Sequence, residues 1–101
     1  MQTIRHGNMS KLASEKIKLE SGREVEIFPL ELMDRAQISD LAVEKRNRKI
    51  PLSMEMCVLA ILKGTKLTAQ AINEWSSGDI YECGARIYRK ANLEELEKKK
   101  L

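Results

Sequence analysis

The sequence is poor in the residues that build catalytic and metal sites. It holds one histidine, His6, and two cysteines, Cys57 and Cys83. A zinc site takes about four nitrogen or sulfur ligands, and a Ser/His/Asp or Cys/His site would depend on His6, in a segment without periodicity. Gly64-Thr65-Lys66 lacks the preceding strand and second glycine of a phosphate loop. We therefore expect a protein that is not an enzyme and binds no metal or cofactor.

Aromatic residues and long apolar runs are also scarce. Aromatic residues make up 4% of the chain, too few for a platform that stacks single-stranded bases. The longest apolar run, Cys57 to Leu62, is too short to span a bilayer, and the first residues lack the apolar core of a signal peptide. Both cysteines occupy apolar helical positions, as buried thiols of a reducing compartment do. We therefore expect a cytoplasmic protein.

The residues that are present describe one small domain with a mixed charged surface. Hydrophobic residues are 43% and charged residues 33% of the 101 residues, and the net charge is +3. That charge is too small to indicate nucleic-acid binding by itself. A domain of this size has little stability to spare, so self-association would help it.

One segment alternates in the manner of a β-sheet. Ile17 and Leu19 alternate with charged residues, and after Ser21-Gly22 the pattern repeats with Val25 and Ile27. Two such runs around a Ser-Gly pair predict a β-hairpin over residues 15–28, ended by a proline that has no N–H for a ladder. Residues 1–14 show no sustained period and are expected to form a flexible N-terminal arm.

The remainder of the chain has helical spacing. A first helix is predicted from Leu30 to about Arg48 and a second after Ser53, as its N-cap, to Gly64, as its C′ residue. Thr68 then caps a short helix, and a capping box at Ser76 and Asp79 opens a further one. Its apolar positions are Ile80, Cys83, Gly84, Ile87, Tyr88 and Ala91.

These elements together predict a fold that is mainly α. We expect the N-terminal β-hairpin to be followed by a compact bundle of four to five short helices, an α+β small domain over residues 15–92. Asn92 restarts a last turn or two in this interpretation, and residues 93–101 form a charged C-terminal tail that is exposed and frays.

A cluster of basic residues is the candidate contact for an anion. Lys45, Arg46, Arg48 and Lys49 fall within five positions, and such a cluster can meet phosphates. The alternative is that these cations only complement the negative end of a helix dipole.

Three larger side chains are candidate partner-binding residues. Met56 and Tyr81 fall off the inner stripes of their helices, and Trp75 stands at the end of the short helix. Methionine adapts its shape, and tryptophan and tyrosine anchor interfaces. We expect Trp75 and Tyr81 to flank a groove between two helices at the Ser76–Asp79 junction.

Two segments carry a resemblance to a known family. KIKLESGREVEIFPLELMDRAQISDLA (residues 16–42) and LKGTKLTAQAINEWSSGDIYECGARI (residues 62–87) are similar to the tail assembly chaperones of long-tailed bacteriophages. The resemblance lies in caps and apolar spacing, and the arm and the basic cluster depart from it. It implies a non-enzymatic protein of the host bacterial cytoplasm that binds and solubilises the helical, apolar tape measure protein during tail assembly, and that self-associates.

The resemblance also implies a longer frameshifted form. Lys98 to Lys100 is a candidate slip site, and the alternative is a plain charged tail.

Two other functions stay open from the residues alone. One is a small basic nucleic-acid-binding or regulatory phage protein that uses the basic cluster and the basic N-terminal arm, with binding that falls steeply with salt. The other is a structural component of the virion.

Overall fold

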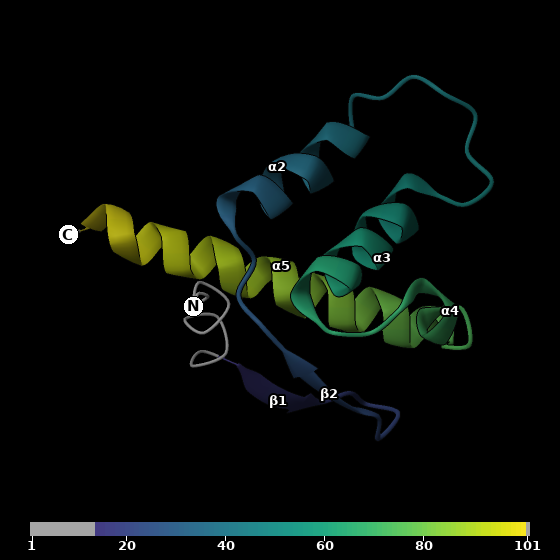
Figure 1. Ribbon diagram of the computed structural model, residues 1–101, viewed down its shortest axis with the longest axis horizontal. Helices are drawn as coiled ribbons and strands as arrows, with labels where there is room; N and C mark the ends of the chain where they lie inside the picture. The colour runs from purple at the N-terminus through teal and green to yellow at the C-terminus, as the bar shows by residue number, and fades with distance from the viewer. Residues whose placement is uncertain (1–13, 101) are drawn as a thin grey trace, which may run out of the picture.

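A computed structural model describes residues 14–100, with side chains to Ala91. The expected fold is confirmed: an antiparallel β-hairpin is followed by four helices (Figure 1). The elements are β1 Glu15–Lys18, β2 Glu24–Ile27, α2 Leu32–Leu41, α3 Leu52–Gly64, α4 Ala69–Ile72 and α5 Ser77–Lys100. The expected N-terminal arm, His6 included, lies outside the described residues except for Ser14.

The hairpin closes through a three-residue loop. Leu19 N–H donates to Arg23 O and Gly22 N–H donates to Leu19 O, both at 2.8 Å. Gly22 has a φ of 99°, the left-handed conformation that the last residue of such a loop requires. Ile17 lies opposite Val25 in the ladder, so the apolar residues of both strands share one face.

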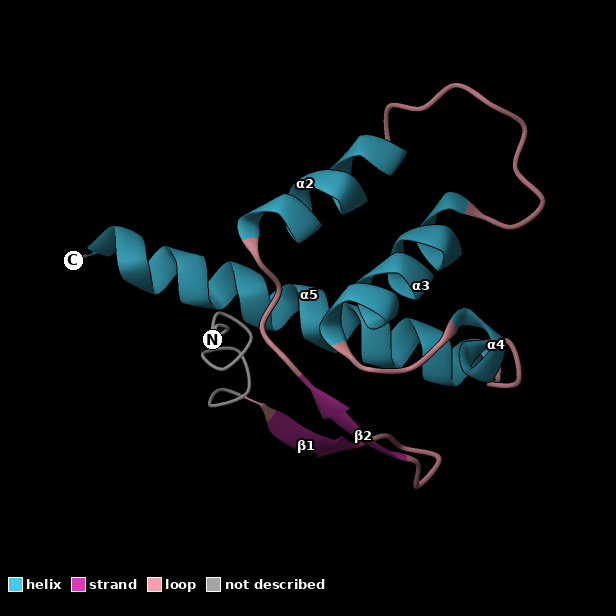
Figure 2. Ribbon diagram, in the orientation of Figure 1, coloured by secondary structure: helices cyan, strands magenta, loops and turns pink. Residues whose placement is uncertain are grey.

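That apolar face packs against α5, beneath which the hairpin lies (Figure 2). Hydrogen bonds and one ion pair also tie β1 and the turn to α5. Arg86 Nη1 donates to Lys18 O at 3.1 Å, Glu20 N–H donates to Glu82 Oε1 at 3.1 Å, and Lys90 Nζ lies 2.8 Å from Glu15 Oε1. The hairpin therefore sits on α5 both by burial and by polar contacts.

The core is built mainly from the hairpin, α3 and α5, and α2 and α4 each add one isoleucine, Ile38 and Ile72. Its members are Ile17, Leu19, Val25, Ile27, Leu30, Ile38, Ala60, Ile61, Ile72, Ile80, Cys83, Ile87 and Ala91. The α5 members match the predicted apolar stripe. Where the sequence predicts a break at Asn92, the backbone continues as one helix to Lys100, so the expected separate tail is helical backbone.

Helix α2 is shorter than predicted. It begins at Leu32, where Asp34 Oδ2 accepts a hydrogen bond from Glu31 N–H at 3.0 Å, and ends at Leu41 rather than Arg48. Residues 42–47 are all exposed, so nothing in this stretch has an apolar face to bury as helix. The basic cluster therefore lies in the connection to α3.

Two predicted caps are wrong and two are confirmed. Helix α3 starts after Pro51 rather than Ser53, and Gly64 is its last residue rather than C′. A side chain at Gly64 would meet Ile87 Cγ2 at 2.7 Å, so close packing explains this glycine. Thr68 Oγ1 accepts from Ala71 N–H at 3.2 Å and Ser76 Oγ accepts from Asp79 N–H at 3.2 Å, as expected of N-caps.

Candidate functional site

The first candidate site is an apolar groove between α2, α3 and α5, called here the α2 groove. It encloses about 210 Å³. Its lining is Ile38, Ser53, Met56, Cys57, Ala60, Gly84, Ala85 and Tyr88. Ser53 and Tyr88 bring the only side-chain hydroxyls to this lining, and no charged side chain takes part. The groove is therefore suited to aliphatic groups rather than to a charged ligand.

Small residues create the space in this groove. Helix α5 approaches α3 so closely at Gly84 that an added Cβ would lie 2.5 Å from Cys57 Cβ. Ala60 and Ala85 remove further volume from the walls on either side. Burial raises the pKa of the Cys57 thiol, so it stays protonated at neutral pH and acts as a small apolar group.

The two predicted residues nearest this groove have different roles. Met56 is half-buried and lines it. Tyr81 does not line it; its hydroxyl lies 3.3 Å from Ser53 Oγ. Tyr81 thus links α5 to the first turn of α3, beside the mouth of the α2 groove.

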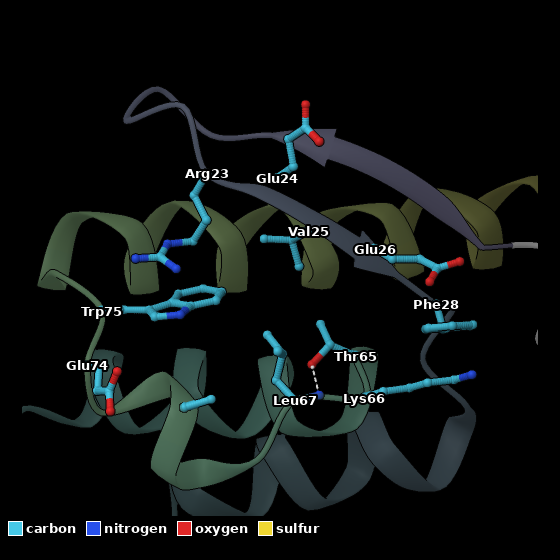
Figure 3. A pocket seen from close by; sticks show the side chains of 11 residues that line it. Arg23, Glu24, Val25, Glu26, Phe28, Thr65, Lys66, Leu67, Glu74 and Trp75 are labelled. Atoms are coloured by element: carbon cyan, nitrogen blue, oxygen red, sulfur yellow. Dashed lines mark hydrogen bonds between the residues drawn. The ribbon is translucent and has the colours of Figure 1, made fainter.

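The second candidate site is a hollow beside β2, called here the β2 hollow. It encloses about 490 Å³ between β2 and the chain that connects α3 to α4 (Figure 3). Its lining is Arg23, Glu24, Val25, Glu26, Phe28, Thr65, Lys66, Leu67, Ala71, Glu74 and Trp75. Trp75 therefore lines a space between a strand and a loop, and not the predicted groove between two helices.

One wall of the β2 hollow is formed by Arg23, which makes a cation–π contact with Trp75 and an ion pair with Asp79. Arg23 lies over the Trp75 ring, with its guanidinium carbon 4.6 Å from the ring centroid, and its Nε is 3.0 Å from Asp79 Oδ2. Asp79 is 5% exposed. The hydrogen bond from Arg23, and then that from Ser21, lowers the pKa of the Asp79 carboxyl. This wall is pre-organised because Trp75 is held by a cation–π contact.

The opposite wall is held by backbone and hydroxyl contacts. Thr65 Oγ1 donates to Ile61 O at 2.6 Å and accepts from Leu67 N–H at 3.1 Å. Lys66 Nζ lies 5.3 Å from the Phe28 ring centroid. These contacts fix the loop that faces β2, so the hollow has two defined sides.

Half of the basic cluster, Arg46 and Arg48, is engaged within the protein. Arg46 and Arg48 both bind Glu55, and Arg48 also donates to the carbonyl oxygens of Glu44 and Leu41. The hydrogen bond from Arg46 lowers the pKa of Glu55. Of the two carbonyl oxygens that Arg48 binds, only that of Leu41 belongs to α2, and no basic residue lies in the last turn of that helix, so the dipole interpretation applies only to the contact of Arg48 with Leu41 O.

Lys45 and Lys49 are exposed and make no hydrogen bond or ion pair with any described residue. They are the two members of the basic cluster that no described side chain engages.

Met56, Trp75 and Tyr81 thus lie in three different settings. The edge of β2 and the wall residues Phe28 and Leu67 were not predicted as a site, because each comes from a distant segment and carries no local motif.

Among the described residues, whose side chains are given from Ser14 to Ala91, no group of three or more His, Cys, Asp or Glu side chains could hold a metal ion. None of the helices described there is long and apolar enough to cross a membrane.

Comparison of the chain with protein-family models, curated proteins and solved structures finds no match in any of the three.

Proposed function

We propose that this protein is a non-enzymatic tail assembly chaperone that holds an apolar helical segment of a tape measure protein in the α2 groove. The observation that carries the proposal is an open apolar groove, free of charged side chains, with the predicted contact residue Met56 in its wall. The similarity of residues 16–42 and 62–87 to tail assembly chaperones supplies the identity of the partner.

The size and chemistry of the groove suit an anchor from an amphipathic helix. A volume of about 210 Å³ takes one or two aliphatic side chains, and helices dock in such grooves through apolar residues one turn apart. Met56 can adjust to different anchors because its thioether side chain is flexible. A small contact of this kind binds weakly at each site, which is what a coat that must later be displaced requires.

The nucleic-acid alternative has less support. Two of its four predicted cations, Arg46 and Arg48, are bound to Glu55. Phosphates would have to compete with that carboxylate, leaving Lys45 and Lys49 as the members of the basic cluster that no described carboxylate binds.

The test is co-expression with the tape measure protein, measured as the soluble fraction of that protein and its co-purification. Met56→Lys places a charge in the α2 groove and is expected to abolish at least nine-tenths of the co-purified protein, as a loss of more than about 1.4 kcal/mol in binding would. Met33→Lys is the matched control, because Met33 is 67% exposed and does not line the groove.

A second variant separates binding from folding. Ala85 is exposed and lines the α2 groove, so Ala85→Phe should fill it without burying a charge. Both groove variants should keep the unchanged protein's far-UV circular dichroism. If they retain full co-purification, or if Met33→Lys loses it equally, the α2 groove is not the binding site. Binding that instead falls steeply with salt would favour the nucleic-acid alternative.

A further inference from the structure

The two edges of the hairpin differ in what covers them. In an antiparallel ladder, residue pairs alternate between those that exchange hydrogen bonds and those whose backbone groups point outward. The hydrogen bond from Leu19 N–H to Arg23 O marks that pair as bonded, so Ile17 with Val25 is bonded too. The N–H and C=O groups of Glu24 and Glu26 therefore point away from β1.

The outer edge of β1 is covered by α5. Its outward Lys18 carbonyl accepts from Arg86, and Glu20 N–H, just beyond the strand, donates to Glu82. The outer edge of β2 is closed only at its end, where Phe28 N–H donates to Gly64 O at 2.8 Å. Among the backbone described over residues 14–100 and the side chains described over residues 14–91, no group accepts from or donates to the outward backbone groups of Glu24 and Glu26. Such an edge is a template for another strand.

The open edge borders the β2 hollow. Val25 points toward Leu67 and Thr65, whereas Glu24 points away from them (Figure 3). A strand added along this edge would therefore direct alternate side chains into the hollow, against Leu67 and Trp75. The side chains between them would lie on the other face, beside Glu24 and Glu26.

The charges decide which strand fits. Both outer-face residues of β2 are glutamates, and opposite charges on neighbouring strands are favourable while like charges are unfavourable. A second copy pairing antiparallel through β2 would set Glu24 and Glu26 against the same two residues. The β1 edge of a second copy is already covered by α5, so the occupant is a different chain.

We propose that the outer edge of β2 is a strand-addition site for an extended segment of a partner protein in which apolar and basic residues alternate. The apolar residues enter the β2 hollow, and the basic residues pair with Glu24 and Glu26. Backbone hydrogen bonds supply affinity and the alternating pattern supplies specificity. The site is separate from the α2 groove, so its test and that of the proposed function can fail independently.

The first experiment measures binding of blocked synthetic peptides to the full chain. The probe has the sequence GKVKVKG, and its acidic counterpart is GEVEVEG. In an added antiparallel strand the lysine amides point at β2 and the valine amides point to solvent. N-methylation of the lysine amides should weaken binding at least about tenfold, the effect of a lost hydrogen bond or two. The same methylation of the valine amides is the matched control and should change binding by less than about threefold.

Charge reversal tests the pairing from the protein side. The double variant Glu24→Lys/Glu26→Lys should lose GKVKVKG and gain GEVEVEG, each by about tenfold or more. Glu20→Lys is the control, because Glu20 is an exposed carboxylate in the turn outside the β2 hollow. Equal effects of Glu20→Lys and the double variant would overturn the pairing.

Amide hydrogen exchange of the unchanged protein locates the site directly. Saturation with GKVKVKG should slow exchange of the Glu24 and Glu26 amides at least about tenfold, while Val25 and Ile27, already bonded to β1, change little. Slow exchange of Glu24 and Glu26 without peptide would mean that the edge is already occupied, and would overturn the inference. Protection confined to the α2 groove would do the same.

Discussion

The crossing of α3 and α5 and the segment that contains α2 are held by different means. At the crossing, Ile61, Cys83 and Ile87 are at most 2% exposed, and Gly84 brings the two backbones into contact. In α2 only Ile38 is buried, while Leu32 and Met33 are 69% and 67% exposed. The first region is held by burial, and the second by one apolar anchor and a few polar contacts. Regions of low burial open at lower free energy than the core, so the α2 groove has one wall that can adjust to a ligand.

The largest expected loss of stability comes from truncating one buried isoleucine in each region, Ile61 at the crossing of α3 and α5 and Ile38 in α2. Ile61→Ala should lower the free energy of unfolding by about 4 kcal/mol, since a fully buried side chain leaves a cavity. Ile38→Ala should cost about 2 kcal/mol, because α2 can undock before the rest unfolds. Denaturant unfolding gives both values. Hydrogen exchange should show faster opening of α2 alone in Ile38→Ala, and uniform acceleration there would contradict the difference between the regions.

The next effect concerns the contact between helix backbones. Gly84→Ala places a Cβ 2.7 Å from Cys57 Cα, which a backbone cannot readily avoid, and should cost about 2–3 kcal/mol. Gly78→Ala is the control in the same helix, because its nearest neighbour is Ser76 Oγ at 4.0 Å. It should be neutral or stabilise by up to about 1 kcal/mol. Thermal unfolding of the two variants checks this, and similar losses would show that the close approach is not the cause.

The smallest expected loss of stability comes from two ion pairs, one in each region: Arg23–Asp79 beside α5 and Arg46–Glu55 beside α2. Asp79, 7% exposed in its side chain, ties α5 to the hairpin through Arg23, whereas Glu55, 23% exposed, ties α3 to the connection after α2. Each pairing lowers the pKa of its carboxyl below the ordinary value, 3.8 for Asp79 and 4.5 for Glu55. Such a group stabilises the fold fully above its ordinary pKa and loses that contribution as the pH falls through the lowered value.

Asp79→Asn should therefore lower the melting temperature near neutral pH and flatten its fall in acid. Glu55→Gln should also lower the melting temperature, but by a smaller amount. Added salt should reduce the loss in Glu55→Gln more than the loss in Asp79→Asn, because exposed ion pairs are screened more strongly. Melting curves over a pH series at two salt concentrations test this. A larger loss for Glu55→Gln than for Asp79→Asn would contradict the ranking of the two regions.

Local signals in the sequence were sufficient for most of the elements. The alternation around Ser21-Gly22 and the caps at Thr68 and Ser76 depend on neighbours a few residues apart, and all three are present in the structure. The end of α2 at Leu41 could not be predicted, because the residues that follow Leu41 are also of types that are common in helices. What ends the helix is the lack of anything to bury beyond Leu41, and Arg48 then binds the carbonyl oxygen of Leu41, the last residue of α2.

The candidate sites were predicted only in part. Met56 was chosen as a candidate because it departs from the stripe of its own helix, a local property. Its companions in the α2 groove, such as Ile38 and Gly84, come from other helices, and no spacing connects them. Trp75 was recognised by its type, but its contacts with Arg23 and its place beside β2 depend on segments some fifty positions apart in the chain.

The sequence by itself determined the element types and the inner faces of the hairpin and α5, because these follow from composition and from periods of two and of 3.6 residues. Tertiary structure decided which edge of the hairpin is covered and where the grooves lie. Arg86 reaches Lys18 and Gly64 reaches Phe28 only once the hairpin is set between α5 and the end of α3. The open edge of β2 is what remains after those contacts form.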